Sequence, residues 1–137
     1  MKICIVVANY YPKISKELVK GAIRILKKNN LFKYKKISAP GIFEIPVIIT
    51  RNIKNYDAFI ALGCVIKGKT PHFNFISSAT TNAIMQISIT HQKPIGNGIL
   101  NCLNINQALK RSDVKNKDKG GEAAKAVLSV LGILKNE

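Results

Sequence analysis

The sequence predicts a single α/β domain: a three-layer α/β/α sandwich whose parallel sheet of about four strands is covered by helices on both faces. The chain has 137 residues, the length of one ordinary domain. Its composition, 47% hydrophobic and 21% charged, is typical of globular proteins. Short apolar runs also alternate with segments of helical periodicity, which indicates strand–helix units joined by right-handed crossovers. We therefore expect one domain over residues 1–137.

The first strand and the first helix have the clearest patterns. Residues 3–8 form a continuous, mostly β-branched run, which is typical of a strand buried on both faces. From Ser15, the expected N-cap, apolar residues recur at helical spacing as far as Asn29 and Asn30. Asparagine tolerates the left-handed conformation that ends many helices. The sequence thus predicts a strand over 3–8 and a crossover helix from Ser15 to Asn30.

The next segment has weaker signals. Residues 34–38 predict a strand, which the breaker sequence at residues 39–41 ends. Residues 44–53 predict a short helix with Pro46 in its first turn. Residues 58–62 are apolar throughout and predict a second buried strand.

The second half continues the alternation. Thr70 and Pro71 are expected to open a long helix whose apolar face carries Ile76, Ala79, Ala83 and Ile87. A last strand is expected over residues 94–100. Two helices, at 105–111 and 122–134, should follow on either side of a polar stretch at 113–121.

The topology itself predicts where a ligand binds. In parallel sheets, ligands lie beyond the carboxyl ends of the strands. Residues 9–11, 40–44, 63–72 and 97–101 follow or end predicted strands, so we expect them to form the walls of a pocket.

Residues 63–70 form a glycine-containing turn between a buried strand and a helix start. Lys67 and Lys69 lie in it, and Thr70 at the N-cap adds a hydroxyl group to free backbone N–H groups. The helix dipole favours negative charge at this position, so a phosphate would suit the turn. The spacing alone also fits an ordinary strand–helix turn with an ordinary cap.

His72 is the candidate for proton transfer. It lies in the first turn of the predicted helix, where the dipole disfavours the imidazolium and helps to keep the ring neutral. A neutral imidazole accepts a proton. The alternative is a surface histidine without a special role, and His91 has a weaker case for catalysis.

Other polar and aromatic residues allow two interpretations each. Glu44 complements a helix dipole or binds hydroxyl groups. Arg111 stabilises a helix end or clamps a phosphate with its planar fork. Lys119 meets an anion or solvent, and Tyr10 and Tyr11 stack on a heterocycle or cover the core.

The net charge of +15 raises the possibility of a polyanion-binding domain. The lysines are scattered along the chain, only three arginines occur, and no aromatic residues alternate with the basic ones. We therefore expect no nucleic-acid partner and a surface of solvated lysines. A nucleic-acid-binding domain remains the alternative outside enzyme chemistry.

Cysteine usage and hydropathy bear on the compartment. Cys4, Cys64 and Cys102 are odd in number and widely spaced, which fits neither a disulfide framework nor a zinc site. The apolar run after Lys2 is too short for a signal peptide, and no window approaches eighteen apolar residues. We expect a cytoplasmic protein with no membrane association.

Several ordered segments together resemble the lumazine synthase family over essentially the whole chain. They are residues 40–46 (PGIFEIP), 57–58, 62–73 (LGCVIKGKTPHF), 94–98 (PIGNG), 106–111 and 119–120. The resemblance implies a flavodoxin-like sheet and an enzyme of riboflavin biosynthesis. That enzyme would condense 5-amino-6-(D-ribitylamino)uracil with 3,4-dihydroxy-2-butanone 4-phosphate to 6,7-dimethyl-8-ribityllumazine, with no metal or redox cofactor.

The resemblance also implies residue roles. For the pyrimidine substrate, these are stacking by Tyr10, ribityl binding by Ile42, Phe43 and Glu44, backbone contacts from Cys64, Val65 and Ile66, and approach of Lys119 to the ring edge. For the second substrate, they are phosphate binding by Lys69, Thr70 and Arg111 and a pocket wall at Asn97. His72 would be the catalytic residue that shuttles protons.

The family forms pentamers or assemblies of pentamers with the active site between subunits, so the resemblance implies a homo-oligomer. Residues 40–44 and 63–72 would come from one chain, and residues 97–111 from the next.

The chain departs from the family at four positions. Asn97 replaces a frequent Phe, Cys64 and Asn101 replace frequent Thr, and Ile42 replaces a frequent Ala. The amide at Asn97 bears on substrate affinity rather than on the type of reaction. Two further alternatives stay open: a scaffold that lost its activity, and the dismutation of lumazine to riboflavin, against which residues 70–72 argue.

Overall fold

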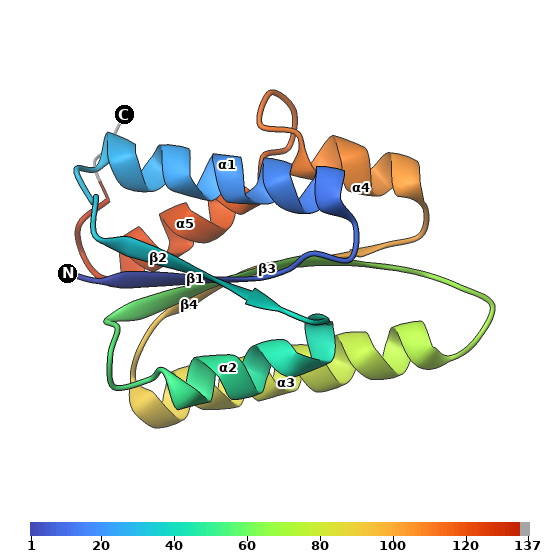
Figure 1. Cartoon of the computed structure of the whole chain (residues 1–137), viewed down its shortest axis with the longest axis horizontal. Coiled ribbons are helices and arrows are strands. Elements are labelled where there is room, and N and C mark those ends of the chain that lie inside the picture. The colour runs from blue at the N-terminus through green and yellow to red at the C-terminus, as the bar shows by residue number, and fades with distance from the viewer. Residues whose placement is uncertain (135–137) are drawn as a thin grey trace.

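In the computed structural model, which describes residues 1–134, a four-stranded parallel sheet lies between two layers of helices (Figure 1). The strand order is β2-β1-β3-β4, so β2 and β4 are the edges. The strands are β1 (Ile3–Ala8), β2 (Tyr34–Ala39), β3 (Ala58–Ile66) and β4 (Ile95–Cys102). The predicted α/β/α sandwich is confirmed.

The helices divide between the two faces of the sheet (Figure 1). One layer contains α1 (Pro12–Lys28), α4 (Ile105–Ser112) and α5 (Lys119–Val130). The other contains the 3-10 turn η1 (Ile42–Glu44), α2 (Ile45–Arg51) and α3 (His72–His91). This arrangement follows from right-handed crossovers between parallel strands, which place consecutive helices on the face that the chain direction dictates.

The central strand β1 explains why the core has two halves. Its side chains alternate between faces, and all six are buried. Ile3, Ile5 and Val7 pack beneath α1 and α5, whereas Cys4 and Val6 pack beneath α2 and α3. Burying one such aliphatic side chain contributes about 1.5–3 kcal/mol, so a continuous apolar run is stable here only if both faces are covered.

The start of α1 differs from the prediction. The helix begins at Pro12, and Ser15 lies inside its first turn instead of capping it. Proline at the first helical position costs no hydrogen bond, because the amide there has no partner in the helix. The Ser15 hydroxyl instead donates to the carbonyl oxygens of Ala8 and Tyr11, each at 3.0 Å. The predicted left-handed stop is confirmed at Asn30, which has φ 62°.

β3 is four residues longer than predicted, which changes the picture of residues 63–70. Gly63 to Ile66 belong to the strand and pair with Ile99 to Cys102 of β4. Gly63 does not mark a turn: a Cβ there would overlap the side chain of Ile42 from η1. The glycine therefore lets the 3-10 turn approach the sheet, and the connecting loop is confined to residues 67–71.

α3 begins at His72, and its N-cap is Pro71, one residue after the predicted cap at Thr70. The hydroxyl of Thr70 still accepts a hydrogen bond from the His72 N–H, at 3.4 Å. The fully buried stripe comprises Ile76, Thr80 and Ile84. Ala79 is exposed, contrary to the prediction. The buried residues of α3 are spaced four apart, and Ala79 lies outside that row. Its methyl group also gains little from burial.

The remaining helix boundaries also shift. α2 ends at Arg51 rather than residue 53. α5 runs from Lys119 to Val130, whereas the prediction was residues 122–134. Asp118 caps α5, because its Oδ1 accepts a hydrogen bond from the Gly121 N–H at 3.1 Å. The two glycines that suggested a loop lie inside the first turn.

Gly120 permits the close contact between α1 and α5. A Cβ on Gly120 would overlap the carbonyl oxygen of Leu18. We expect Gly120→Ala to lower the free energy of unfolding by about 2 kcal/mol, because rigid backbone on both sides must move. Urea unfolding of Gly120→Ala beside Gly68→Ala, whose Cβ would lie in open space, checks this. Equal stabilities of the two variants would contradict it.

None of the helices within residues 1–134 is both long and apolar enough to cross a membrane.

Candidate active site

A cavity of about 430 Å³ lies at the carboxyl ends of β1 and β3, and we call it the aromatic pocket. Its walls come from the β1–α1 turn, η1, the end of β3 and the first two turns of α3. The lining residues are Tyr10, Tyr11, Gly41, Ile42, Phe43, Glu44, Cys64, Val65, Ile66, His72 and Ile76. The topology therefore brings most of the predicted pyrimidine-binding residues together with His72.

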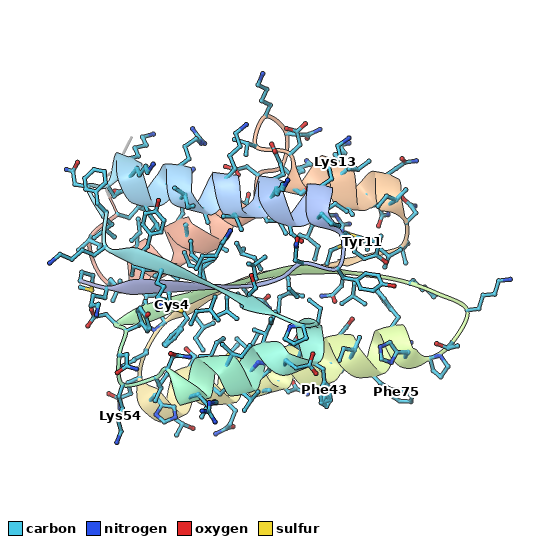
Figure 2. All side chains as sticks on the ribbon, in the orientation of Figure 1. Cys4, Tyr11, Lys13, Phe43, Lys54 and Phe75 are labelled. Carbon is cyan, nitrogen blue, oxygen red and sulfur yellow. The ribbon has the colours of Figure 1, made fainter. Side chains whose placement is uncertain are left out.

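Exposed aromatic rings border this pocket. Tyr10 is 75% exposed and packs edge-on against Tyr11, with ring centroids 4.9 Å apart. Phe43 is 66% exposed, and Figure 2 shows it on the helical layer opposite α1. Uncovered aromatic faces at the mouth of a cavity are suited to stack on a planar ring.

Glu44 adds the only carboxylate of the aromatic pocket's lining. It stands at the N-terminus of α2, but its side chain does not cap the helix. Within the described part of the chain its carboxylate accepts no hydrogen bond. Both oxygens can therefore accept hydrogen bonds from the hydroxyl groups of a ligand.

Cys64 contributes to the pocket as a neutral thiol. Its pKa is raised from 9.0 to about 12, mainly by burial and in smaller part by the neighbouring Cys102 thiol. Burial likewise raises the pKa of Cys4 to about 11. The pKa of the Tyr11 hydroxyl is also raised, mainly by burial. Because the thiolate is the reactive form, Cys64 is not a nucleophile here, and what it offers a ligand is its backbone.

We expect the thiols of the native protein to react slowly. At pH 8, modification of the folded protein by a chromogenic disulfide should be at least about 100-fold slower than that of the urea-unfolded protein, since Cys4, Cys64 and Cys102 are buried. The raised pKa values also stabilise the fold below pH 9, a contribution lost progressively between pH 9 and about 12. Rapid modification of any thiol in the folded protein would contradict this expectation.

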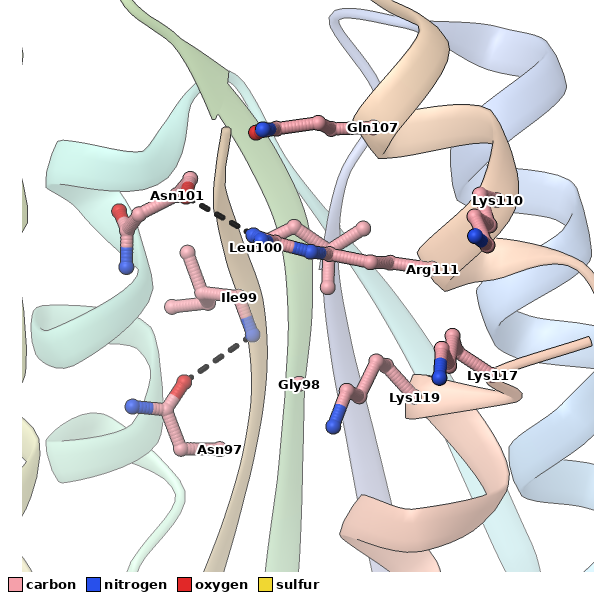
Figure 3. Close-up of a pocket in the computed structure, with 10 residues that line it drawn as sticks. All are labelled: Asn97, Gly98, Ile99, Leu100, Asn101, Gln107, Lys110, Arg111, Lys117 and Lys119. Carbon is pink, nitrogen blue, oxygen red and sulfur yellow. Dashed lines mark hydrogen bonds between the residues drawn. The ribbon is translucent and has the colours of Figure 1, made fainter. Parts of the chain in front are cut away.

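A second cavity of about 650 Å³ lies along the edge strand β4, and we call it the basic pocket (Figure 3). Its remaining walls come from α4 and from the segment that leads into α5. The lining residues are Asn97, Gly98, Ile99, Leu100, Asn101, Gln107, Lys110, Arg111, Lys117 and Lys119. Its lining within residues 1–134 contains four cations and no carboxylate.

Arg111 is held in place on the wall of the basic pocket. Its Nη1 donates to the backbone oxygen of Asn101 at 3.3 Å and lies 3.8 Å from the sulfur of Cys102. The Asn101 side chain accepts from the Ser77 hydroxyl at 2.7 Å, which ties β4 to α3. A guanidinium group fixed by one N–H keeps its other donors for a phosphate.

The other polar residues of the basic pocket are also partly engaged. The side-chain oxygen of Asn97 accepts from the Ile99 N–H at 3.0 Å, and Figure 3 shows its amide nitrogen on the side away from Arg111 and Lys119. Lys119 forms an exposed ion pair with Glu122 at 3.0 Å. Such a pair contributes little stability, so a ligand anion can replace the carboxylate.

Two predicted phosphate ligands lie outside both pockets. Lys69 and Thr70 are exposed, belong to the loop of residues 67–71, and line neither cavity. The two pockets share no lining residue. A single chain therefore presents the predicted site as two separate halves, one with His72 and one with Arg111.

Sequence reasoning missed three residues of the basic pocket. Gln107 and Lys110 lie on α4 near Arg111, and Gln107 precedes Arg111 by four residues, a spacing that places both on one helix face. That spacing could have identified Gln107. Lys117 lies in an irregular segment, where no periodicity indicates direction. Among the described residues, no cluster of three or more potential metal ligands occurs.

Comparison of the sequence with known proteins identifies the family of this chain. A family model described as 6,7-dimethyl-8-ribityllumazine synthase matches residues 1–135. The chain is 42% identical over 139 residues to the 6,7-dimethyl-8-ribityllumazine synthase of Wigglesworthia glossinidia brevipalpis, covering 98% of this chain and 90% of the relative. The enzyme of the same name from Bartonella tribocorum is 40% identical over 136 residues, covering 97% and 89%.

This chain belongs to the lumazine synthase family. The resemblance predicted from the ordered motifs is thereby confirmed, and with it an enzyme of riboflavin biosynthesis. Two pockets near the strand ends also fit an enzyme of this family better than they fit a polyanion-binding domain.

Proposed function

We propose that this chain condenses 5-amino-6-(D-ribitylamino)uracil with 3,4-dihydroxy-2-butanone 4-phosphate to 6,7-dimethyl-8-ribityllumazine, with release of phosphate and water. The observation that carries the proposal is the pairing of two pockets in a chain of this family. One pocket combines aromatic rings with a histidine, and the other combines an arginine with further cations. The first suits a planar heterocycle and the second suits a phosphate.

The aromatic pocket would bind the pyrimidine substrate. Tyr10 would stack on the ring, while Ile42, Phe43 and Glu44 would hold the ribityl chain through apolar contact and hydroxyl–carboxylate hydrogen bonds. The end of β3, residues 64–66, would present backbone N–H and C=O groups to the ring edge. Lys119 of the basic pocket would approach the same edge.

The basic pocket would bind the phosphate of the second substrate. Arg111 offers a planar fork of donors that matches phosphate oxygens. Lys69 and Thr70, which stand just before the N-terminus of α3, would close the phosphate site from the other side. Asn97 would line the wall between the two substrates.

The reaction requires several proton transfers, and His72 would perform them. The amine of the pyrimidine attacks the ketone, which loses its oxygen as water to give an imine. Phosphate is then eliminated, and the ribitylamine nitrogen closes the ring with loss of a second water. His72 would accept and return protons during these steps. Both reactants are intrinsically reactive, so holding them in one orientation supplies much of the acceleration.

We further propose that the functional unit is a homo-oligomer, either a pentamer or an assembly of pentamers. Two half-sites that do not meet in one chain support this, because a neighbouring copy would complete each of them. α3 also exposes Phe75, Met85 and Ile89, which are 70%, 59% and 64% exposed. A helix that is apolar on its outer side as well is normally covered by another element.

The compartment is part of the same proposal. Three free, buried cysteines suit a reducing environment, so we propose that the enzyme acts in the cytoplasm.

The direct test is lumazine formation by the purified protein. Both substrates are supplied at saturation, and the product is followed by its absorbance and fluorescence together with release of phosphate. We expect product only when both substrates are present. Undetectable product would contradict the proposed function, and a riboflavin spectrum without added butanone phosphate would indicate the dismutation instead.

A further inference from the structure

Two lysines of the basic pocket have no part in the chemistry described above. Lys110 lies in the last turn of α4 next to Arg111, and Lys117 lies in the segment before α5. Figure 3 shows both on the side of the pocket formed by α4 and the following segment. Both are exposed, so their charges face solvent as well as the pocket.

The backbone fixes these two lysines beside each other. The Lys117 N–H donates to the Lys110 carbonyl oxygen at 3.3 Å. The N–H groups of Asn116 and Asp118 both donate to the Asp113 carbonyl oxygen, at 3.0 and 2.9 Å. The segment from α4 to α5 is thus folded back onto the end of α4, and the position of Lys117 is a consequence of this turn.

The acidic side chains near the basic pocket are engaged elsewhere. Asp113 accepts from the Lys115 N–H at 2.9 Å, and Glu17 accepts from the Val114 N–H at 3.1 Å. Asp118 caps α5 and pairs with Arg24 at 3.4 Å. Glu122 pairs with Lys119. Within residues 1–134, therefore, no direct ion pair offsets the positive charges of Lys110, Arg111 and Lys117.

We propose that Lys110 and Lys117 form an electrostatic entrance to the phosphate half of the site. The pair draws the doubly charged phosphate substrate from solution toward Arg111 without touching the reacting atoms. A cleft lined by one sign of charge raises the association rate of an oppositely charged ligand by about 10-fold or more at low salt. This inference rests on the proposed function and adds a selective capture step for the anionic substrate.

Charge-matched variants provide the test. Lys110→Gln/Lys117→Gln removes two charges from the entrance. Lys27→Gln/Lys54→Gln removes two exposed charges at the other end of the sheet, near the C-terminus of α1 and after α2. We measure kcat/KM for the butanone phosphate at saturating pyrimidine, from about 0.02 M to about 0.5 M salt, a range over which the screening length falls severalfold.

The entrance variant should lose about fivefold in kcat/KM for the phosphate substrate at the lowest salt. Its salt dependence should be shallower than that of the wild type, so the two converge at high salt. kcat and the KM for the uncharged pyrimidine should stay within about twofold, because rim charges act mainly on association. The distant pair should match the wild type.

Three outcomes would overturn the inference: equal losses in both variants, a loss that persists at high salt, or a fall in kcat. The single variants Lys110→Gln and Lys117→Gln keep the test decisive if the double variant assembles poorly, since each should show an intermediate loss. Binding of inorganic phosphate, followed by calorimetry across the same salt range, is independent of turnover. A wild type that makes no lumazine refutes the proposed function, whereas phosphate binding weakened equally by both pairs refutes the entrance.

Discussion

Replacing Arg111 with alanine is expected to raise the KM for 3,4-dihydroxy-2-butanone 4-phosphate between about 10- and 100-fold, since a hydrogen bond to a charged group contributes about 1.5–3 kcal/mol. The KM for the pyrimidine should change little, because Arg111 lines the basic pocket and not the aromatic pocket. Steady-state kinetics with each substrate varied in turn measures both values.

Arg111→Lys is the informative control. It keeps the positive charge but loses the planar fork and the hydrogen bond to the Asn101 carbonyl oxygen. We expect a KM between those of the wild type and the alanine variant. An alanine variant that raises both KM values equally would contradict the division of the site, because it would indicate a general loss of structure.

Replacing His72 with alanine is expected to lower kcat about 100-fold while substrates still bind, because general acid–base catalysis by one side chain contributes about 10²–10⁴-fold. The ring lies in the wall of the aromatic pocket and is largely exposed, so its removal leaves the fold intact. Steady-state turnover and fluorescence titration with the pyrimidine substrate separate the two effects.

His91 supplies a matched control for His72. It is exposed and ends α3, a helix of 20 residues whose opposite end lines the aromatic pocket. His91→Ala should turn over like the wild type. Loss of pyrimidine binding in His72→Ala that matches the loss of kcat would assign His72 to substrate binding and contradict its role in proton transfer.

The sequence correctly predicted the elements that are determined by the residues within them. β1 has the predicted bounds because a short, mostly β-branched apolar run is typical of a strand covered on both faces. Glycines misled the prediction at two places: Gly63 lies within β3, and Gly120 and Gly121 lie within α5. In both cases the glycine serves a close approach between elements distant in sequence, and such contacts leave no periodic pattern.

The candidate site was predictable in part. The rule for strand ends identified the walls at residues 9–11, 40–44 and 97–101, and the family motifs supplied the residue roles. Lys117 could not be found, because its direction depends on the turn that folds residues 113–118 onto α4. The separation of His72 from Arg111 was expected from the resemblance alone, since the pattern of elements does not show which strand ends share a cavity.

The most direct test of a site shared between two copies is complementation. His72→Ala and Arg111→Ala chains are unfolded in urea, mixed in equal amounts and refolded together. Activity is then assayed at a phosphate-substrate concentration well below the KM of Arg111→Ala, so that the variants refolded separately are nearly inactive. In a head-to-tail ring, about a quarter of the sites would combine an intact His72 with an intact Arg111 from the neighbouring copy. Lumazine formation should therefore rise to about a quarter of the wild-type rate, well above the mean of the two variants refolded separately. A mixture that stays at that mean would contradict an active site built from two subunits.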